Sequence, residues 1–364
     1  DSLHLLRAAL DVKGIHTERP GYERHEIDRL LDLLDDHPLS IELIAPHLKT
    51  LTPAEICTDF AKFLEHFTNP AAPEYRNRGL LASLDFSRAH LSQAAQDVLP
   101  WLAWFEGGVF DAFLLAFTEL QPEAWQAICG ELVATALLKV EDDILVGDRP
   151  YLRFHPTLRY AAQASQVPEP EAAGQRFIQV YLAVRDLLDG LLHGERPGLG
   201  MQLVALEEAN LRSAMQRAFG RGLRWEGQRL AETLRDYLER AGRNRERDLL
   251  AVWVHAQLPE QVLDAAACSA LREHAWALLT QGQTPEAVSM LQELLARLQN
   301  EGLAEGKDAA FQIAVSYLYL GRIYYYDGRA DLALAPLQQA ILGFEPMQGD
   351  VARGNLSAAL GSLA

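Results

Sequence analysis

LREHAWALLTQGQTPEAVSMLQELL (271–295) and YLYLGRIYYYDGRADLALAPLQQAI (317–341) are two copies of one pattern. Aligned without gaps, they match small residues with small residues, a glycine with a glycine, and large apolar residues with large apolar residues. The matched positions are Ala275 with Gly321, Leu278 with Tyr324, Gly282 with Gly328, Ala287 with Ala333, and Leu291 with Leu337. Small residues allow two helices to cross closely, and a glycine suits the turn between them. The pattern therefore predicts stacked helix pairs, with a third copy beginning at Leu360 and Gly361.

The rest of the chain also has helical periodicity, with one exception. Segments such as HEIDRLLDLLDD (25–36) and QRFIQVYLAVRDLLDGLL (175–192) place apolar residues at intervals of three and four. ALLKVEDDILVGDRPYLRFHP (136–156) instead contains two short β-favouring runs, separated by the turn residues Gly147 and Asp148. We therefore expect a mainly α protein with one small hairpin at about residues 138 to 154.

Composition limits the classes of function. The chain has 364 residues, of which 49% are hydrophobic, so it can form several domains with substantial cores. Lys+Arg number 33 against 50 Asp+Glu, and the resulting net charge of -17 repels phosphate backbones, so no direct nucleic-acid partner is expected.

The cysteines and the apolar segments bear on the cellular compartment. Cys57, Cys129 and Cys268 are far apart and form no CxxC pair, which suggests neither a disulfide framework nor a zinc site and favours a reducing cytoplasm. The sequence has no apolar run of about 18 residues and no signal-peptide pattern. We therefore expect a cytoplasmic protein with no membrane partner.

The two copies resemble repeats of the tetratricopeptide family. In that family the first helix of each pair lines a concave groove for a protein partner or ligand, and the resemblance assigns a set of residues to that groove. They are Arg272, Trp276, Leu279, Val315, Leu318, Arg322, Tyr325 and Tyr326. Arginine together with exposed aromatic side chains is typical of binding hot spots. Because each repeat leaves an apolar face for its neighbour, the end at Ala364 inside a copy leads us to expect a truncated array.

The tyrosines allow a second interpretation. Aromatic side chains bury large areas, so Tyr324, Tyr325 and Tyr326 could all pack between neighbouring repeats. We assign Tyr324 to packing and leave both interpretations open for Tyr325 and Tyr326.

Upstream, EIDRLLDLLDDHPLSIELIAPHL (26–48) resembles the segment of NB-ARC and related STAND signalling ATPases that carries a G-x-P motif. The motif is present here as Asp36-His37-Pro38, with aspartate in place of glycine. The resemblance implies that Pro38 packs on the adenine of a bound nucleotide. The alternative is an ordinary proline at the first position of a helix, where its missing N–H has no cost.

Residues 78–117 are similar to the start of the winged-helix domain that follows in the same proteins, through the SLDFS run and the helix AAQDVLPWLAWF. Phe154-His155-Pro156 then stands in the place of the family's MHD motif, with only the histidine kept. The resemblance implies that His155 senses the β-phosphate of bound ADP. The alternative is a buried or half-buried histidine at a strand-to-helix junction.

Residues 203–257 are similar to the helical linker between winged helix and repeats in bacterial STAND proteins. The predicted domains are a helical subdomain (1–70) that follows an absent nucleotide-binding core, a winged helix (71–165), a helical linker (166–258) and tetratricopeptide-like repeats (259–364). The expected fold is thus mainly α: a helical subdomain, a winged helix with a small β-hairpin, and an α-solenoid.

Catalytic motifs are missing. An ATPase needs a glycine-rich loop with a lysine and a magnesium ligand, and the nearest match, GLAEGKD (302–308), has too short a spacing and lacks the Ser or Thr. The histidines have no metal-ligand spacing. PEAWQAICGELVATALL (122–138), in the position of a recognition helix, has no Lys or Arg, which indicates packing and not DNA reading. We expect no catalytic residue, metal or cofactor within this chain, and ADP or ATP in the full-length protein.

These features predict the regulatory and sensor region of a STAND-type signal-transduction ATPase. In it the repeats bind a trigger, the winged helix couples that event to the nucleotide state of the upstream core, and activation leads to an oligomer. Two alternatives remain. One is a constitutive tetratricopeptide scaffold, which would bind partners regardless of nucleotide. The other is the regulatory part of a bacterial transcriptional activator whose DNA-binding output domain lies outside these residues.

Overall fold

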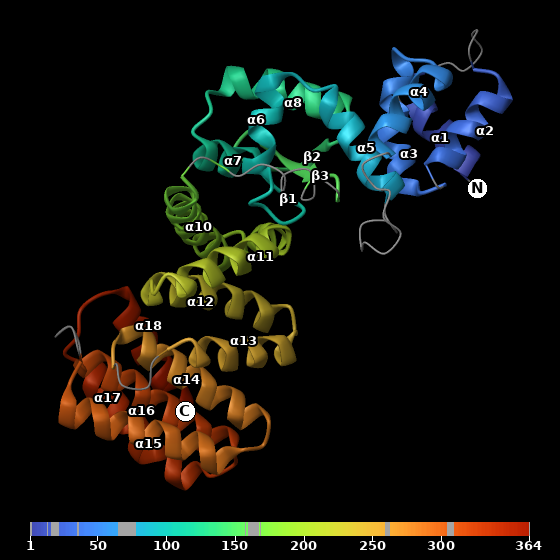
Figure 1. The fold of residues 1–364 in the computed structure, drawn as a ribbon. Coiled ribbons are helices and arrows are strands. Elements are labelled where there is room, and N and C mark those ends of the chain that lie inside the picture. Colours follow the sequence, from blue (N-terminus) through green and yellow to red (C-terminus); the bar gives the residue numbers. More distant parts are fainter. Residues whose placement is uncertain are drawn as a thin grey trace. The chain divides into compact units, whose positions relative to one another are not determined.

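The structure is a computed structural model with two compact units, Asp1–Val180 and Tyr181–Ala364, and the division falls within helix α10 (Pro170–His193) (Figure 1). It describes residues 2–12, 14–15, 22–34, 36–64, 78–156, 158, 167, 169–258, 263–303 and 309–363. The predicted domain boundaries at 70/71, 165/166 and 258/259, together with Ala364 and the 304–308 part of the GLAEGKD loop, lie at or beside residues outside these ranges. The predicted domains therefore stay predictions.

Within the described residues the fold is mainly helical, as predicted. The first unit begins with short helices packed around one apolar core. They are α1 (Ser2–Val12), α2 (Arg24–Leu33), α3 (Pro38–Ile44), the 3-10 helix η1 (Ala45–Lys49), α4 (Pro53–Leu64) and α5 (Arg78–Ala89). Leu30, Ile41, Ile56, Phe60 and Phe86 are fully buried in this core. Burial of these apolar side chains is what orders helices too short to be stable alone.

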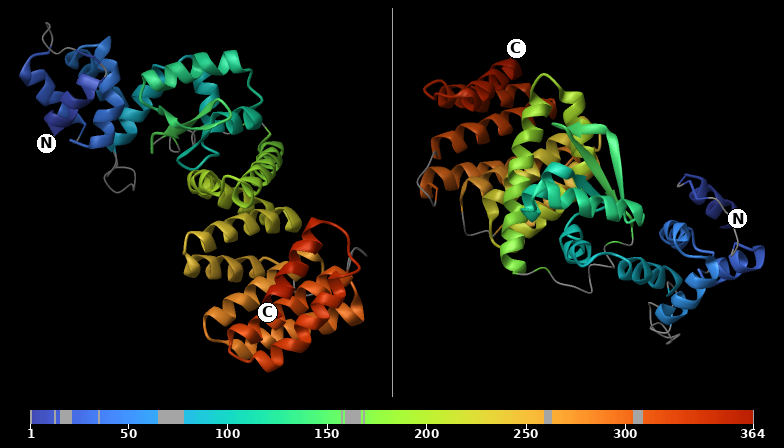
Figure 2. Two further views of the ribbon diagram at one scale, coloured as in Figure 1. Left: turned by 180° about the vertical axis from the view of Figure 1, so that it is seen from behind. Right: turned by 90° about the horizontal axis from the view of Figure 1, so that it is seen from above.

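In its described residues, the second part of this unit combines helices with a small antiparallel sheet. The elements are α6 (Gln93–Leu102), β1 (Gly108–Phe110), α7 (Asp111–Thr118), α8 (Pro122–Ala134), β2 (Leu138–Val146) and β3 (Arg149–Phe154). The sheet order is β1-β3-β2, and the strands β2 and β3 run side by side in both views of Figure 2. Gly147, with a φ of +67°, makes the turn between them. The hairpin predicted at about residues 138 to 154 is therefore confirmed.

An aromatic core closes this part of the unit. Phe117 lies at its centre, with ring centroids 5.4 Å from Phe105 and 5.3 Å from Phe177 of α10. Both contacts are edge-on, the geometry that the ring quadrupoles favour. These rings fix the start of α10 against α7.

The second unit is a series of antiparallel helices, each lying beside the next (Figure 1). After the end of α10 they are α11 (Pro197–Gly220), α12 (Arg224–Arg240), α13 (Asn244–Ala256), α14 (Ala265–Thr280), α15 (Thr284–Glu301), α16 (Ala309–Tyr326), α17 (Ala330–Phe344) and α18 (Asp350–Leu363). Alternate helices also touch, as in α12 with α14, α14 with α16, and α16 with α18. The helices therefore form successive pairs that pack on one another.

Four helix ends in this unit share one turn geometry. Gly222, Gly242, Gly282 and Gly328 have φ of +72°, +71°, +78° and +79°. The residue after each glycine, in the order Leu223, Arg243, Gln283 and Arg329, donates its amide to a carbonyl five residues earlier at 2.8–2.9 Å. This is the Schellman ending, which requires the left-handed backbone that glycine adopts at no steric cost. The turn glycines predicted at Gly282 and Gly328 are confirmed, and the same turn also occurs twice upstream of the two copies.

Close helix crossing explains the small residues in the copies. A Cβ placed on Gly321 would lie 2.6 Å from Leu337 Cγ and 3.2 Å from the Leu337 backbone nitrogen, so no larger residue fits without a shift. Ala275, the matched position, is fully buried. None of the helices in the described ranges combines the length and apolar character that crossing a lipid bilayer requires.

Candidate functional site

Pro38 starts helix α3 and is exposed. The preceding His37 has an extended backbone, and Asp36 adopts a left-handed φ of +52°, so the chain makes a sharp turn into the helix. Proline suits this position because its fixed φ matches the helix and it has no N–H to satisfy. This geometry fits the ordinary helix-start interpretation, and the predicted contact with adenine stays a prediction.

His155 directly follows β3 and is buried, with 9% of the residue exposed. Its amide donates to Leu137 O at 2.9 Å, which ties the junction to the end of α8, and Leu158 donates back to its carbonyl. Burial lowers the pKa of the imidazole from 6.5 to about 4, so the ring is neutral near pH 7. The structure thus places His155 directly after β3 as a buried, uncharged side chain, and the helix predicted to follow it lies largely outside the described residues.

Glu42 lies next to His155 and was not identified from the sequence. Its Oε2 is 3.8 Å from Nε2 of His155, and its side chain is half exposed. Glu42 lies on α3 one turn after Pro38. The structure therefore brings α3, the helix that begins with Pro38, next to His155, and these are the two predicted nucleotide contacts. A carboxylate at this position would compete with a phosphate for the imidazole.

Three of the eight predicted groove residues are buried. Arg272, Val315 and Leu318 are 6%, 7% and 2% exposed. Arg272 Nη1 donates to Gln312 Oε1 at 2.8 Å, and burial lowers the pKa of its guanidinium. Arg272 thus joins α14 to α16, whereas Val315 and Leu318 lie in the core that α16 forms with α17 and α18. A partner would therefore contact the other predicted residues.

The remaining residues gather at the ends of α14 and α16. Leu279 is half-buried against the core of the helix pairs. The Arg322 guanidinium stacks 4.9 Å from the centroid of the Trp276 ring. Tyr326 meets Trp276 edge-on at 5.4 Å and Tyr325 at 5.5 Å. We call Trp276, Arg322, Tyr325 and Tyr326 the aromatic cluster.

The two tyrosines of the aromatic cluster remain accessible. Tyr325 is 52% exposed and Tyr326 is 61% exposed, whereas Tyr324 is half-buried and packs against the cores of both helix pairs. Tyr324 therefore packs as predicted. Tyr325 and Tyr326 are exposed, and their contact with a partner stays a prediction.

A groove of about 660 Å³ adjoins the aromatic cluster. It lies between α13 and α14 and shares Trp276 with the cluster. Its lining residues are Asn244, Arg245, Arg247, Asp248, Leu249, Trp276, Thr280 and Gln281. Of these residues, only Trp276 was predicted from the sequence; those on α13 lie in the predicted linker (166–258). We call it the α13–α14 groove.

A buried polar network positions the helices behind the aromatic cluster. Glu273 of α14 pairs with Arg235 of α12 and accepts a hydrogen bond from the hydroxyl of Tyr319 of α16 at 2.5 Å. Burial and the Glu273 carboxylate raise the pKa of Tyr319, which keeps the hydroxyl protonated. Tyr319 meets Trp276 edge-on at 6.3 Å. The network therefore fixes three helices whose relative position sets the shape of the aromatic cluster.

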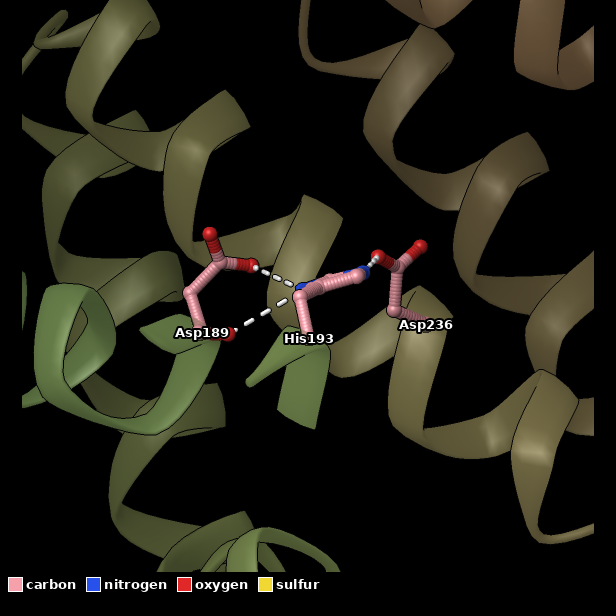
Figure 3. A group of neighbouring side chains, drawn as sticks. All are labelled: Asp189, His193 and Asp236. Atoms are coloured by element: carbon pink, nitrogen blue, oxygen red, sulfur yellow. Dashed lines mark hydrogen bonds and ion pairs between the residues drawn. The ribbon is translucent and has the colours of Figure 1, made fainter. Parts of the chain in front are cut away.

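Asp189, His193 and Asp236 form a group with metal-ligand side chains among the described residues (Figure 3). His193 lies between the two carboxylates: Nδ1 is 3.4 Å from Asp189 Oδ1, and Nε2 is 3.4 Å from Asp236 Oδ2. Because the two ring nitrogens face different carboxylates, the imidazole acts as a bridge between α10 and α12. Asp236 also pairs with Arg235 at 2.8 Å. These contacts give the group a structural role.

Basic side chains near the sheet are already engaged. Arg149 pairs with buried Asp111 at 2.8 Å, and Arg153 pairs with Glu141 at 2.8 Å. Helix α8 contains no Lys or Arg. Among the described residues of β2, β3 and α8, these arginines thus present little free positive charge for a phosphate backbone.

Comparisons with known proteins found few likenesses. No protein-family model matches the chain, and no curated protein matches its sequence. One solved structure that matches is a signal transduction ATPase with numerous domains (STAND) protein with a tetratricopeptide repeat sensor, from Pyrococcus horikoshii. The two share 12% identity with a TM-score of 0.31, over 100% of this chain and 62% of the other. This chain therefore spans less than two thirds of that protein, and a TM-score this low does not establish a shared fold.

Proposed function

We propose that this chain is a protein-binding regulatory region whose helix pairs recognise a partner protein through the aromatic cluster. The observation that supports it is the exposure of Tyr325 and Tyr326 beside a stacked Arg322–Trp276 pair. Tyrosine, tryptophan and arginine are the residues that carry most binding energy at interfaces. They stand here on helices held by a buried network, so little conformational entropy is lost on binding.

The proposal extends to the first unit. We assign it to the helical subdomain and winged helix of a STAND-type protein, non-enzymatic by itself, working with an upstream core that binds ADP or ATP. The sequence resemblance supports this assignment, as does the order of helix α8 followed by the hairpin β2–β3. In this assignment the α13 and α14 helices belong to an α-solenoid that passes the binding event toward the nucleotide-binding core.

Site-specific crosslinking tests the partner surface. A photoreactive phenylalanine analogue replaces Tyr325 in the protein expressed in its own host, and Trp225, which is 51% exposed on α12, receives the same analogue as a control. We expect one discrete adduct at position 325 that is absent at 225 and lost when Arg322→Ala is added. Equal crosslinking at positions 325 and 225 would contradict the proposed function.

Nucleotide retention tests the regulatory assignment. The chain is expressed with its native upstream residues, purified without added nucleotide, denatured, and the released small molecules are identified. We expect ADP from the native sequence and less ADP from His155→Ala. Release of no nucleotide by either protein would contradict the assignment and leave the partner surface unaffected.

The constitutive scaffold is a second candidate, and one observation favours it. His155 is neutral and faces Glu42 at 3.8 Å, so it can contact a phosphate only if this carboxylate moves away. A scaffold would bind its partner equally with ADP, with ATP and without nucleotide. A regulatory region would change its partner affinity between these states, because only differential affinity shifts an equilibrium.

A further inference from the structure

The floor of the α13–α14 groove is electrically balanced. Arg247 is 6% exposed and pairs with Asp248 at 2.8 Å, and Asp248 accepts a second hydrogen bond from Thr280 at 2.6 Å. These contacts join α13 to α14, and the exposed Glu239 of α12 lies 3.8 Å from Arg247 as well, so the positive charge of Arg247 is already matched. Charge on a ligand must therefore be matched by side chains at the rim.

One arginine lines the rim of the groove, and a second stacks on one of the lining residues. Arg245 lines the groove and is exposed, and Arg322 stacks on Trp276, which also lines it. Among the residues that the structure describes, no carboxylate forms an ion pair with either guanidinium.

The acidic residues nearby in the sequence are already engaged. Glu246 pairs with Arg243, and Asp327 pairs with Arg329 at 2.7 Å and accepts from Thr284. Arg245 and Arg322 are therefore the positive side chains that remain for a ligand at this groove, in a chain whose net charge is -17.

The rim also has apolar surface. Leu249 is 60% exposed and follows Arg245 by one turn, and Val252 of the same helix face is 38% exposed. Opposite them stands the half-buried Trp276. A volume of about 660 Å³ is in the range of roughly 300–1,000 Å³ that is typical of pockets for small-molecule ligands.

We propose that the α13–α14 groove binds an acidic segment of a partner protein. Carboxylates of the segment pair with Arg245 and Arg322, and an apolar side chain between them packs against Leu249 and Trp276. Arginine favours carboxylates because its planar fork donates two parallel hydrogen bonds. A nucleic acid would carry a negative charge at every nucleotide, beyond the groove and over the acidic remainder of the chain, whereas a short acidic segment places its few carboxylates at the two arginines. The inference rests on the proposed function and adds the chemistry of the partner.

Selection from a random peptide library displayed on phage tests the inference. The whole chain is immobilised, and recovered peptides are synthesised with a fluorescent label for anisotropy titrations. We expect peptides enriched in Asp and Glu around one apolar residue. Arg245→Ala and Arg322→Ala should each weaken binding by about tenfold, and Leu249→Asn should weaken it as well. Raising the salt from about 50 to about 300 mM should weaken it further, because the rim is exposed.

Arg353→Ala is the matched control, since it removes one exposed positive charge from α18 of the same unit and should leave affinity unchanged. Recovered peptides that depend on Tyr326 but are not acidic would overturn the inference and keep the proposed function. Peptides indifferent to both Tyr326→Ala and Arg245→Ala would overturn both. A labelled single-stranded oligonucleotide is titrated in parallel. If it binds more tightly than the selected peptides and loses affinity in Arg245→Ala, the inference of an acidic protein segment is overturned in favour of a nucleic acid.

Discussion

At the residue scale, the crossing of α16 and α17 depends on the absence of one side chain. Gly321 faces Leu337, with 2.6 Å between a built Cβ and the Leu337 Cγ. Gly321→Ala should therefore destabilise the unit by about 1–3 kcal/mol through overpacking, although alanine is the better helix former. Gly354→Ala in α18 is the control, because nothing lies within 4 Å of its built Cβ. Urea unfolding, monitored through the helix content, should show a lower free energy of unfolding for Gly321→Ala only. Equal stability of the two variants would mean that α17 can shift to accommodate the added methyl group.

Two buried histidines set a pH dependence for the first unit. Burial, with a further contribution from His90, lowers the pKa of His47 to about 4, and burial lowers that of His155 to about 4. Protons bind the unfolded imidazoles near 6.5 and the folded ones near 4, so stability is present above pH 6.5 and falls as the pH drops toward 4. Each histidine should lower the free energy of unfolding of the first unit by about 2 kcal/mol when the pH falls from 7.5 to 5.

Urea unfolding of the native chain and of His47→Gln at these two pH values measures this effect. His47 contacts Ser87 Oγ at 3.2 Å, so the glutamine can keep a polar contact while it cannot titrate. The variant should lose about half of the pH dependence. An unchanged slope would place the proton uptake on other groups.

At the element scale, the sequence was most informative where a pattern is local. The hairpin was predicted from adjacent β-favouring runs and turn residues, and it pairs as expected. Strand β1 was missed because three residues, Gly108–Phe110, carry no periodicity and their partner β3 begins 39 positions after β1 ends, from 110 to 149. The α13–α14 groove was missed for a similar reason. Exposure of Leu249 depends on which face a neighbouring helix covers, and spacing within α13 does not reveal it.

For the predicted partner site, spacing in the sequence indicates which face of a helix a residue occupies, but it does not indicate whether that face is buried. Arg272, Trp276 and Leu279 follow helical spacing, so the sequence groups them on one side of α14. Only the packing of α16 decides that Arg272 is buried while Trp276 stays partly accessible. The contact between Glu42 and His155 joins residues 113 positions apart, from 42 to 155, and no local pattern could have indicated it.

The Schellman turns allow a prediction for whole elements. Gly242 ends α12 with a φ of +71°, and Arg243 donates to Leu238 O at 2.8 Å. Gly242→Ala should cost about 1 kcal/mol, because a Cβ is disfavoured in the left-handed region, and Gly242→Asn should cost less. The two variants are compared by urea unfolding. Equal stability of alanine and glycine here would show that the turn relaxes out of the left-handed region.

At the scale of the whole molecule, the two units have separate apolar cores. Residues such as Leu30 and Phe86 form one core in Asp1–Val180, and Leu291 and Phe344 belong to cores in Tyr181–Ala364. Chains with separate cores unfold in more than one step unless an interface couples them. We therefore expect two calorimetric transitions.

The residue-scale changes can assign these transitions. Lowering the pH from 7.5 to 5 should lower the melting temperature of the transition that contains His47 and His155 more than that of the other. Gly321→Ala should lower only the melting temperature of the second unit, by several degrees. A loss of about 1 kcal/mol lowers the melting temperature of a domain of this size by roughly 2–4 °C. Helix α10 belongs to both units, so a single transition that moves with both changes would mean that this helix couples them. In that case a partner that binds the aromatic cluster should also raise the stability of the first unit. The two units would then unfold together, and α10 is the helix that both contain.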